Sequence, residues 1–181
     1  QNTTGLVPLT DFDGHDIWND APDTDEVEAR RAAFHAPYHA ALQAELERVR
    51  AIHGVALLYD CHSIRSHIPF LFDGTLPDFN IGTAGGTTCA PSLQAETLKI
   101  CAKAEGYTHV LNGRFKGGWT TRHYGRPAEG FHAIQMELAQ ATHLEAEVPP
   151  FPYSAEKAAR LRPVLGNILE TLAEKVLELR P

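Results

Sequence analysis

Apolar residues at helical spacing mark two long segments of the chain. Asp23 to Glu26 has the pattern of a capping box, and the apolar positions that follow recur every three or four residues to about residue 52. Pro37 lies inside this segment, where it favours a bend. A second stripe follows Ser154, a candidate N-cap, and consists of Leu161, Leu165, Ile168, Leu172, Val176 and Leu179. The pattern predicts a first helix over 23–52 and a last helix from 154 onward.

Three shorter segments have the pattern of strands. Val55 to Tyr59 is a continuous apolar run directly after the first helix, which is typical of a strand buried on both faces of a parallel sheet. Thr108 to Phe115 and His132 to Leu138 are two further candidates, and Pro91 opens another helix before them. Residues 61–90 show little periodicity and predict a long, ordered loop. Helices that alternate with strands predict an α/β domain with a largely parallel sheet.

Composition narrows the class of protein. Hydrophobic residues make up 43% and charged residues 22% of the 181 residues, as in ordinary globular proteins. The net charge of −7 argues against a nucleic-acid partner, and no apolar run is long enough to suggest a membrane partner. Three cysteines without a CxxC pair favour a reducing, cytoplasmic location without disulfides. The first residue is Gln rather than Met, as in a processed or truncated chain.

Polar residues follow the first predicted strand at once, as Asp60-Cys61-His62-Ser63. In open α/β sheets, sites lie just beyond the carboxyl ends of strands. Neutral imidazole binds zinc, and a nearby carboxylate can orient the ring. His62 is therefore a candidate metal ligand or catalytic residue, and the alternative is a histidine that only hydrogen-bonds a loop. Cys61 would point to the opposite face from His62, so we expect an inert, buried thiol rather than a nucleophile paired with that histidine.

The segment from Gly106 to Ala128 is locally basic. It contains Arg114, Lys116, Arg122 and Arg126 and no Asp or Glu. The planar guanidinium fork matches a carboxylate, and the glycines of this segment allow the backbone to approach a ligand closely. The segment predicts a site for a small anionic molecule, with His123 inside it, and the alternative is a solvated basic loop.

Glu137 lies in the otherwise apolar stretch HAIQMELAQ. A carboxylate that faces a protein interior is costly unless it is paired or used, and burial raises its pKa toward the range of a general base. If the strand alternation holds, Gln135 and Glu137 share one face of the strand. Whether this face is covered or open to solvent is left undecided by the pattern.

Several long motifs resemble those of the N-formylglutamate amidohydrolase (N-formylglutamate deformylase) family. They are QNTTGL, DCHSIRSHIP, LPDFNIGTAGGTTCAP, NGRFKGGWTTRHYGRP and HAIQMELAQ, and they occur in the family's order from residue 1 to about 175. One departure is Cys61, where a small residue such as Ala is expected.

The resemblance implies a three-layer α/β/α fold with a mostly parallel central sheet, similar to zinc carboxypeptidases. It implies zinc-dependent hydrolysis of N-formyl-L-glutamate to formate and glutamate, a step of histidine degradation. His62 would be a zinc ligand, and Glu137 would activate the attacking water. The residues implied to hold the two glutamate carboxylates are Arg65, Arg114, Arg122 and Arg126, with Asn112 and His123 in support.

Family members carry a further segment before QNTTGL that supplies the first metal ligands. We therefore expect residues 1–181 to form a single amidohydrolase domain, the C-terminal two-thirds of a longer enzyme, with the remaining zinc ligands outside this chain. Two alternatives stay open: a hydrolase of another N-acyl amino acid on the same scaffold, and a non-catalytic fragment that binds an acidic ligand. The sequence leaves the oligomeric state undecided.

Overall fold

The computed structural model describes residues 5–180 and divides the chain into two compact units. Unit 1 comprises Gln1–Glu45 and His67–Gly74, and unit 2 comprises Leu46–Ser66 and Thr75–Pro181. The first four residues of the QNTTGL motif lie outside the described part of the chain.

The first predicted helix is present as one helical run with a change of pitch. It consists of α1 (Thr24–Arg30), the π-helical segment η2 (Arg31–His35) and α2 (Ala36–His53). The Asp23 side chain accepts a hydrogen bond of 2.8 Å from the Glu26 amide, which confirms the predicted cap. The N–H at the start of α2 reaches back five residues, to the carbonyl of Arg31. This wider turn immediately precedes Pro37, which has no N–H to continue the regular ladder.

The apolar stripe predicted for this helix is only partly buried. Phe34 and Tyr38 are 74% and 62% exposed, and Leu46 is the buried residue of α2. Among the described residues of unit 1, Ile68 is the one buried hydrophobic side chain. Periodicity predicts which side chains share a face, but burial also requires a surface against which that face packs.

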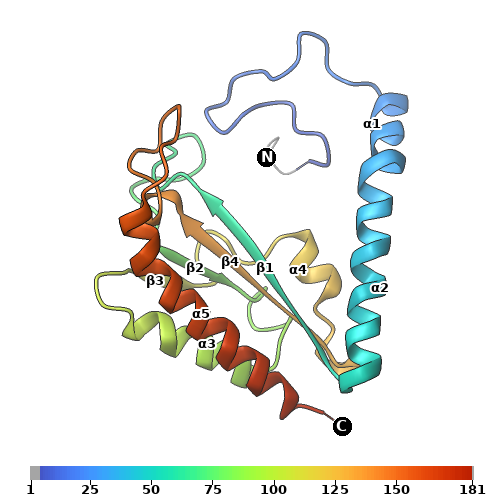
Figure 1. Cartoon of the computed structure of the whole chain (residues 1–181). Coiled ribbons are helices and arrows are strands. Elements are labelled where there is room, and N and C mark those ends of the chain that lie inside the picture. The colour runs from blue at the N-terminus through green and yellow to red at the C-terminus, as the bar shows by residue number, and fades with distance from the viewer. Residues whose placement is uncertain (1–4, 181) are drawn as a thin grey trace. The chain divides into compact units, whose positions relative to one another are not determined.

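Unit 2 contains a four-stranded sheet in the order β1-β4-β2-β3, within the residues described (Figure 1). The strands are β1 (Ala56–Ile64), β2 (Phe79–Gly82), β3 (His109–Leu111) and β4 (Phe131–Ala139). β1 and β4 pair in parallel, as do β2 and β3, whereas β2 and β4 pair in the antiparallel sense. The predicted α/β class with a mostly parallel sheet is confirmed.

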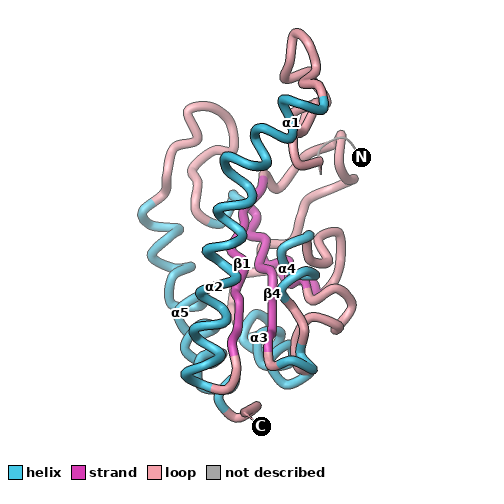
Figure 2. Tube along the Cα trace, turned by 90° about the vertical axis from the view of Figure 1, so that its right-hand side faces the viewer, coloured by secondary structure: helices cyan, strands magenta, loops and turns pink. Residues whose placement is uncertain are grey.

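Helices cover both faces of this sheet. Figure 2 shows α4 (Trp119–Tyr124) on the opposite side of β1 and β4 from α5 (Ala155–Leu177). The apolar core lies on the α5 side, where Ile134 and Met136 of β4 pack with buried residues of α5 and of α3 (Pro91–Lys103). Two short 3-10 turns, η3 (Pro127–Glu129) and η4 (Gln140–Thr142), flank β4.

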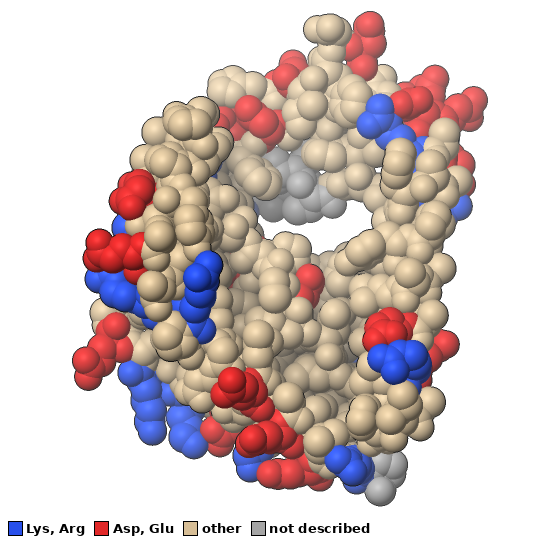
Figure 3. All heavy atoms as spheres, in the orientation of Figure 1, with Lys and Arg blue, Asp and Glu red and all other residues tan. Residues whose placement is uncertain are grey.

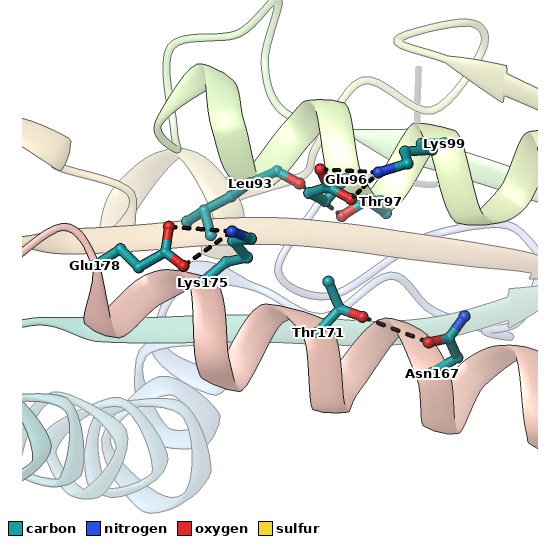
Figure 4. A network of polar contacts seen from close by, with 8 residues as sticks. All are labelled: Leu93, Glu96, Thr97, Lys99, Asn167, Thr171, Lys175 and Glu178. Atoms are coloured by element: carbon teal, nitrogen blue, oxygen red, sulfur yellow. Dashed lines mark hydrogen bonds and ion pairs between the residues drawn. The ribbon is translucent and has the colours of Figure 1, made fainter.

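The packing of α5 confirms the last predicted helix. The buried side chains are Ala158, Leu161, Ile168, Leu172 and Val176, and the Ser154 hydroxyl accepts from the Lys157 amide at 3.4 Å. Figure 4 shows polar side chains where α3 and α5 lie side by side, and each is bonded within its own helix. Pairs of this kind contribute only about 0.2–0.5 kcal/mol each, so the apolar stripe dominates this contact.

The strand boundaries differ from the sequence prediction in three places. β1 continues to Ile64 rather than ending at Tyr59, because it stays in register with β4 to its last residue. The predicted loop 61–90 contains β2, a central strand whose four residues are all buried and which is too short to show alternation. The third strand ends at Leu111, since Asn112 has a positive φ of 51° that no regular strand allows.

The surface carries charged side chains of both signs, as the composition of the sequence leads one to expect. On the face drawn in Figure 3, acidic and basic side chains are interspersed over unit 2. No described helix combines the length and apolarity that crossing a membrane requires. The three cysteines are free, and Cys61 is exposed rather than buried as predicted, because it lies near the open end of the edge strand β1.

Candidate active site

Four polar side chains of β1 and β4 share one face of the sheet. In the parallel register Asp60 lies opposite Gln135, and His62 lies opposite Glu137. Because successive strand residues alternate between faces, these four point away from the apolar core formed with α3 and α5. They lie on the α4 side of unit 2, at the carboxyl ends of both strands.

Glu137 is almost fully enclosed on this face. Its exposed fraction is 6%, and that of Gln135 is 5%, so the face is covered at these two positions, whereas His62 opposite Glu137 is exposed. Burial raises the pKa of Glu137 to about 7, a rise that nearby Asp60 increases and His62 opposes. A carboxyl group with a pKa near neutrality can both accept and return a proton, as general acid–base catalysis requires.

His62 is oriented by a carboxylate of its own strand. Its Nε2 atom lies 3.0 Å from Oδ1 of Asp60, which raises the pKa of the imidazole. With Nε2–H donated to Asp60, the neutral ring keeps its lone pair on Nδ1. A histidine that binds a metal usually donates its other nitrogen to a carboxylate in this way. The second oxygen of Asp60, Oδ2, is buried and without a partner.

These residues fit one ligand of a zinc site and its supporting carboxylate. A catalytic zinc takes three protein ligands, and no described group of three metal-ligating side chains includes His62. Among the described residues, the one such group is Asp11, Asp13 and His15, which is exposed in unit 1. Asp11 holds the group together, because its side chain accepts hydrogen bonds from the backbone amides of Asp13 and His15.

The basic, glycine-rich segment reaches the same face of the sheet. The backbone amide of Gly118 donates to Oε1 of Gln135 at 2.6 Å. Gly82 has to be a glycine here, since a Cβ atom on it would lie 2.5 Å from the Gly117 nitrogen. Arg122 of α4 donates from Nη1 to the Gly117 carbonyl at 2.6 Å. The structure therefore places Arg122 next to the loop that contacts Gln135.

The side chain of Asn112 is hydrogen-bonded to a neighbouring loop. Its Oδ1 accepts from the amides of Thr83 and Gly85 at 2.9 and 3.2 Å, and its Nδ2 donates to the Thr83 hydroxyl at 2.9 Å. In this structure the Asn112 side chain, at the end of β3, holds the turn Thr83–Gly86 in place.

The other predicted substrate residues occupy varied positions. Arg65 is half-buried directly after β1, and Arg114 is exposed after β3. His123 is exposed on α4 and stacks on Trp119 with ring centroids 4.1 Å apart.

Arg126 lies at the other end of β4. Its Nε bonds Glu129 at 2.9 Å, and its guanidinium lies 4.9 Å from the ring centroid of Phe131, the first residue of the strand. Glu137 is six residues further along β4, a distance of about 20 Å. The structure does not bring Arg126 and Glu137 together.

Comparison with known proteins identifies the family. The model of the N-formylglutamate amidohydrolase family matches residues 1–144. The chain belongs to the N-formylglutamate amidohydrolase family. Two relatives named N-formylglutamate deformylase, from Pseudomonas aeruginosa and Pseudomonas putida, are 52% and 51% identical over 172 residues. Each match covers 94% of this chain and 64% of the relative, so the chain spans about two-thirds of their length.

Solved structures share the fold of this chain. The crystal structure of N-formylglutamate amidohydrolase from Ralstonia eutropha JMP134 matches with a TM-score of 0.76 at 24% identity, over 91% of this chain and 60% of that one. A gene product of Agrobacterium tumefaciens matches with a TM-score of 0.61 at 19% identity, over 92% and 62%.

The sequence pattern did not assign roles to three side chains on this face of the sheet. Asp60 and Gln135 each stand two residues before a predicted site residue, a spacing that places both on the same face of a strand. Asn80 is fully buried in β2 opposite Glu137, and its Nδ2 donates to the Glu137 carbonyl at 3.1 Å. The signal in the sequence for Asn80 was its position as the one amide side chain in the short run FNIG.

Proposed function

We propose that this chain forms part of a zinc-dependent hydrolase that cleaves N-formyl-L-glutamate to formate and L-glutamate. Its family membership and its two relatives named deformylases support this substrate. The observation that carries the proposal is the buried carboxyl of Glu137, with its pKa raised to about 7, opposite His62 in the register. A cytoplasmic role in histidine degradation, without a nucleic-acid or membrane partner, belongs to the same proposal.

Glu137 is the general base and then the general acid. It accepts a proton from the water whose oxygen adds to the formyl carbon. It then delivers this proton to the amide nitrogen as the C–N bond breaks, which releases formate and the amine of glutamate. A group with a pKa near the working pH suits both transfers.

His62 would hold the metal through Nδ1, with Asp60 fixing the ring. When bound, zinc supplies polarisation of the formyl carbonyl and lowers the pKa of water toward ~7. The remaining ligands are proposed to come from a part of the enzyme outside this chain. Asp60 orients the imidazole whether or not the metal is present.

Arg122 is the best-placed candidate to bind a substrate carboxylate. It lies on α4, anchored at Gly117, next to the loop that contacts Gln135. Arg65 and Arg114 remain candidates for the second carboxylate, with His123 and Asn112 in supporting positions. A bidentate guanidinium–carboxylate contact would fix the formyl group relative to Glu137.

The substitution Glu137→Gln tests the proposal. The variant keeps the size of the side chain and removes the proton acceptor, so we expect formate release to fall about 10²- to 10⁴-fold. Zinc content, measured by elemental analysis, and binding of N-formylglutamate should stay close to wild type.

Glu170→Gln is the matched control, because Glu170 is an exposed carboxylate on α5, and its turnover should be unchanged. Wild-type turnover in Glu137→Gln would remove the general-base role. An enzyme that contains this chain together with the remaining metal ligands, yet holds no zinc and releases no formate, would instead support a non-catalytic binding role. Faster cleavage of N-acetyl amino acids would support the other hydrolase.

A further inference from the structure

Gln135 is held between the glycine-rich loop and the candidate base. Its side chain is 5% exposed, on the same face of β4 as Glu137. Oε1 accepts from the Gly118 amide at 2.6 Å and from the Thr121 hydroxyl at 3.4 Å, and Nε2 donates to Oε2 of Glu137 at 3.4 Å. Every polar atom of the Gln135 side chain is therefore used.

The donors fix which way round the amide lies. A backbone N–H can only donate, so the end of Gln135 that faces Gly118 must be the oxygen. The NH₂ end then faces Glu137 and can only donate to it. This orientation follows from the hydrogen-bond partners and does not depend on distinguishing nitrogen from oxygen by their positions alone.

We propose that Gln135 is a positioning residue that fixes the Glu137 carboxyl relative to the loop Lys116–Gly118. The proposal rests on the proposed role of Glu137 as the general base. Because Nε2 of Gln135 donates to Oε2, it turns the carboxyl, and we assign the proton exchange with water and with the leaving amine to the other oxygen, Oε1. The same amide ties the base to the loop that anchors Arg122.

The backbone around Glu137 is held as firmly as its side chain. Asn80 donates to the Glu137 carbonyl from β2, and β1 pairs with the other edge of the strand. The Lys116 carbonyl accepts from the Ala84 amide at 2.6 Å, which secures the loop. With both anchors rigid, a change at Gln135 acts on the carboxyl orientation rather than on the position of the strand.

Two substitutions separate positioning from a purely structural role. Gln135→Glu keeps an oxygen toward Gly118 and Thr121 but replaces the donor toward Glu137 with an acceptor. We expect kcat to fall ~10- to 100-fold with KM within ~3-fold of wild type, and Tm to fall because a second buried carboxyl beside Glu137 is costly. Gln135→Met removes both contacts at similar volume, and we expect the same loss of kcat together with a lower Tm.

A second readout does not depend on turnover. In protein labelled with ¹³C at glutamate carboxyl groups, the resonance missing from Glu137→Gln identifies Glu137. We expect Gln135→Glu to shift this resonance and leave that of Glu170 in place. An unshifted resonance overturns the proposal, and so does a kcat of Gln135→Glu within two-fold of wild type.

The two proposals fail separately. Wild-type turnover in Glu137→Gln would refute the role of Glu137 as the base, while the resonance still decides whether Gln135 orients its carboxyl. Loss of turnover in Glu137→Gln with an unaffected Gln135→Glu would refute positioning alone.

Discussion

His132 and Glu137 are two buried ionisable residues on opposite faces of the strand β4. His132 shares its face of β4 with Ile134 and Met136, on the side of the apolar core, and is 5% exposed. Its Nδ1 accepts from the Ala90 amide at 3.2 Å, just before α3. This contact requires a neutral ring, and burial lowers the pKa of His132. His132 is thus a structural residue that joins β4 to the start of α3.

The lowered pKa of His132 predicts a pH dependence of stability. Its folded-state pKa lies below the unfolded value of about 6.5, so the unfolded chain binds the proton first. The contribution of His132 to the free energy of unfolding should be complete above about pH 6.5 and should decrease as the pH falls below that value. His132→Asn, which keeps an acceptor for Ala90, should reduce this decrease.

Urea unfolding at about pH 7.5 and about pH 5.5 measures the effect, since both values lie on the flanks of the histidine range. His53→Asn is the control, because His53 is exposed at the end of α2. Equal losses of stability in His132→Asn and wild type on acidification would contradict this role for His132.

At the scale of elements, α5 shows the clearest link from pattern to packing. Ile168 and Leu169 are neighbours in the sequence, yet the first is fully buried and the second is 46% exposed. The helical period places Ile168 in the stripe that faces the sheet and Leu169 outside it. The stability of unit 2 should therefore depend on one and hardly on the other.

Ile168→Ala should lower the free energy of unfolding by about 2–5 kcal/mol, through lost burial and the cavity left behind. Leu169→Ala is the matched control and should cost less than about 1 kcal/mol. Urea unfolding followed by circular dichroism measures both, and similar losses in the two variants would contradict the stripe.

Other elements were beyond what the pattern could predict. β2 is a four-residue strand with every residue buried, so it lacks the alternation by which strands are recognised. α4 has six residues and follows two glycines, a composition that signals a loop. Both depend on contacts with β4 that are distant in sequence, such as the pairing of Gly82 with Gln135.

At the scale of the whole molecule, the two units differ in how much apolar surface they bury. Unit 2 contains the core cluster on the α3 and α5 side of the sheet. Unit 1 buries one hydrophobic side chain among its described residues, Ile68. Regions with few buried apolar contacts open at a lower free energy than a packed core.

Hydrogen exchange should therefore distinguish the units. We expect amides of Phe131–Ala139 in β4 to be protected up to the global free energy of unfolding, and amides of Thr24–Arg30 in α1 to exchange far faster. Mass spectrometry of peptides from each segment, corrected with the exchange of the unfolded chain, measures this. Equal protection in the two segments would show that unit 1 is as stable as the sheet.

The sequence by itself determined the α/β class, the helices α3 and α5, the cap at Asp23 and the placement of Gln135 and Glu137 on the same face of β4. These features depend on local periodicity and capping chemistry, which neighbouring residues specify. Only the tertiary structure decided that Gln135 and Glu137 are buried, that Asp60 contacts His62, and that Arg126 lies at the opposite end of β4 from Glu137. Strand register and long-range packing set these positions, and neither has a signature within a short stretch of sequence.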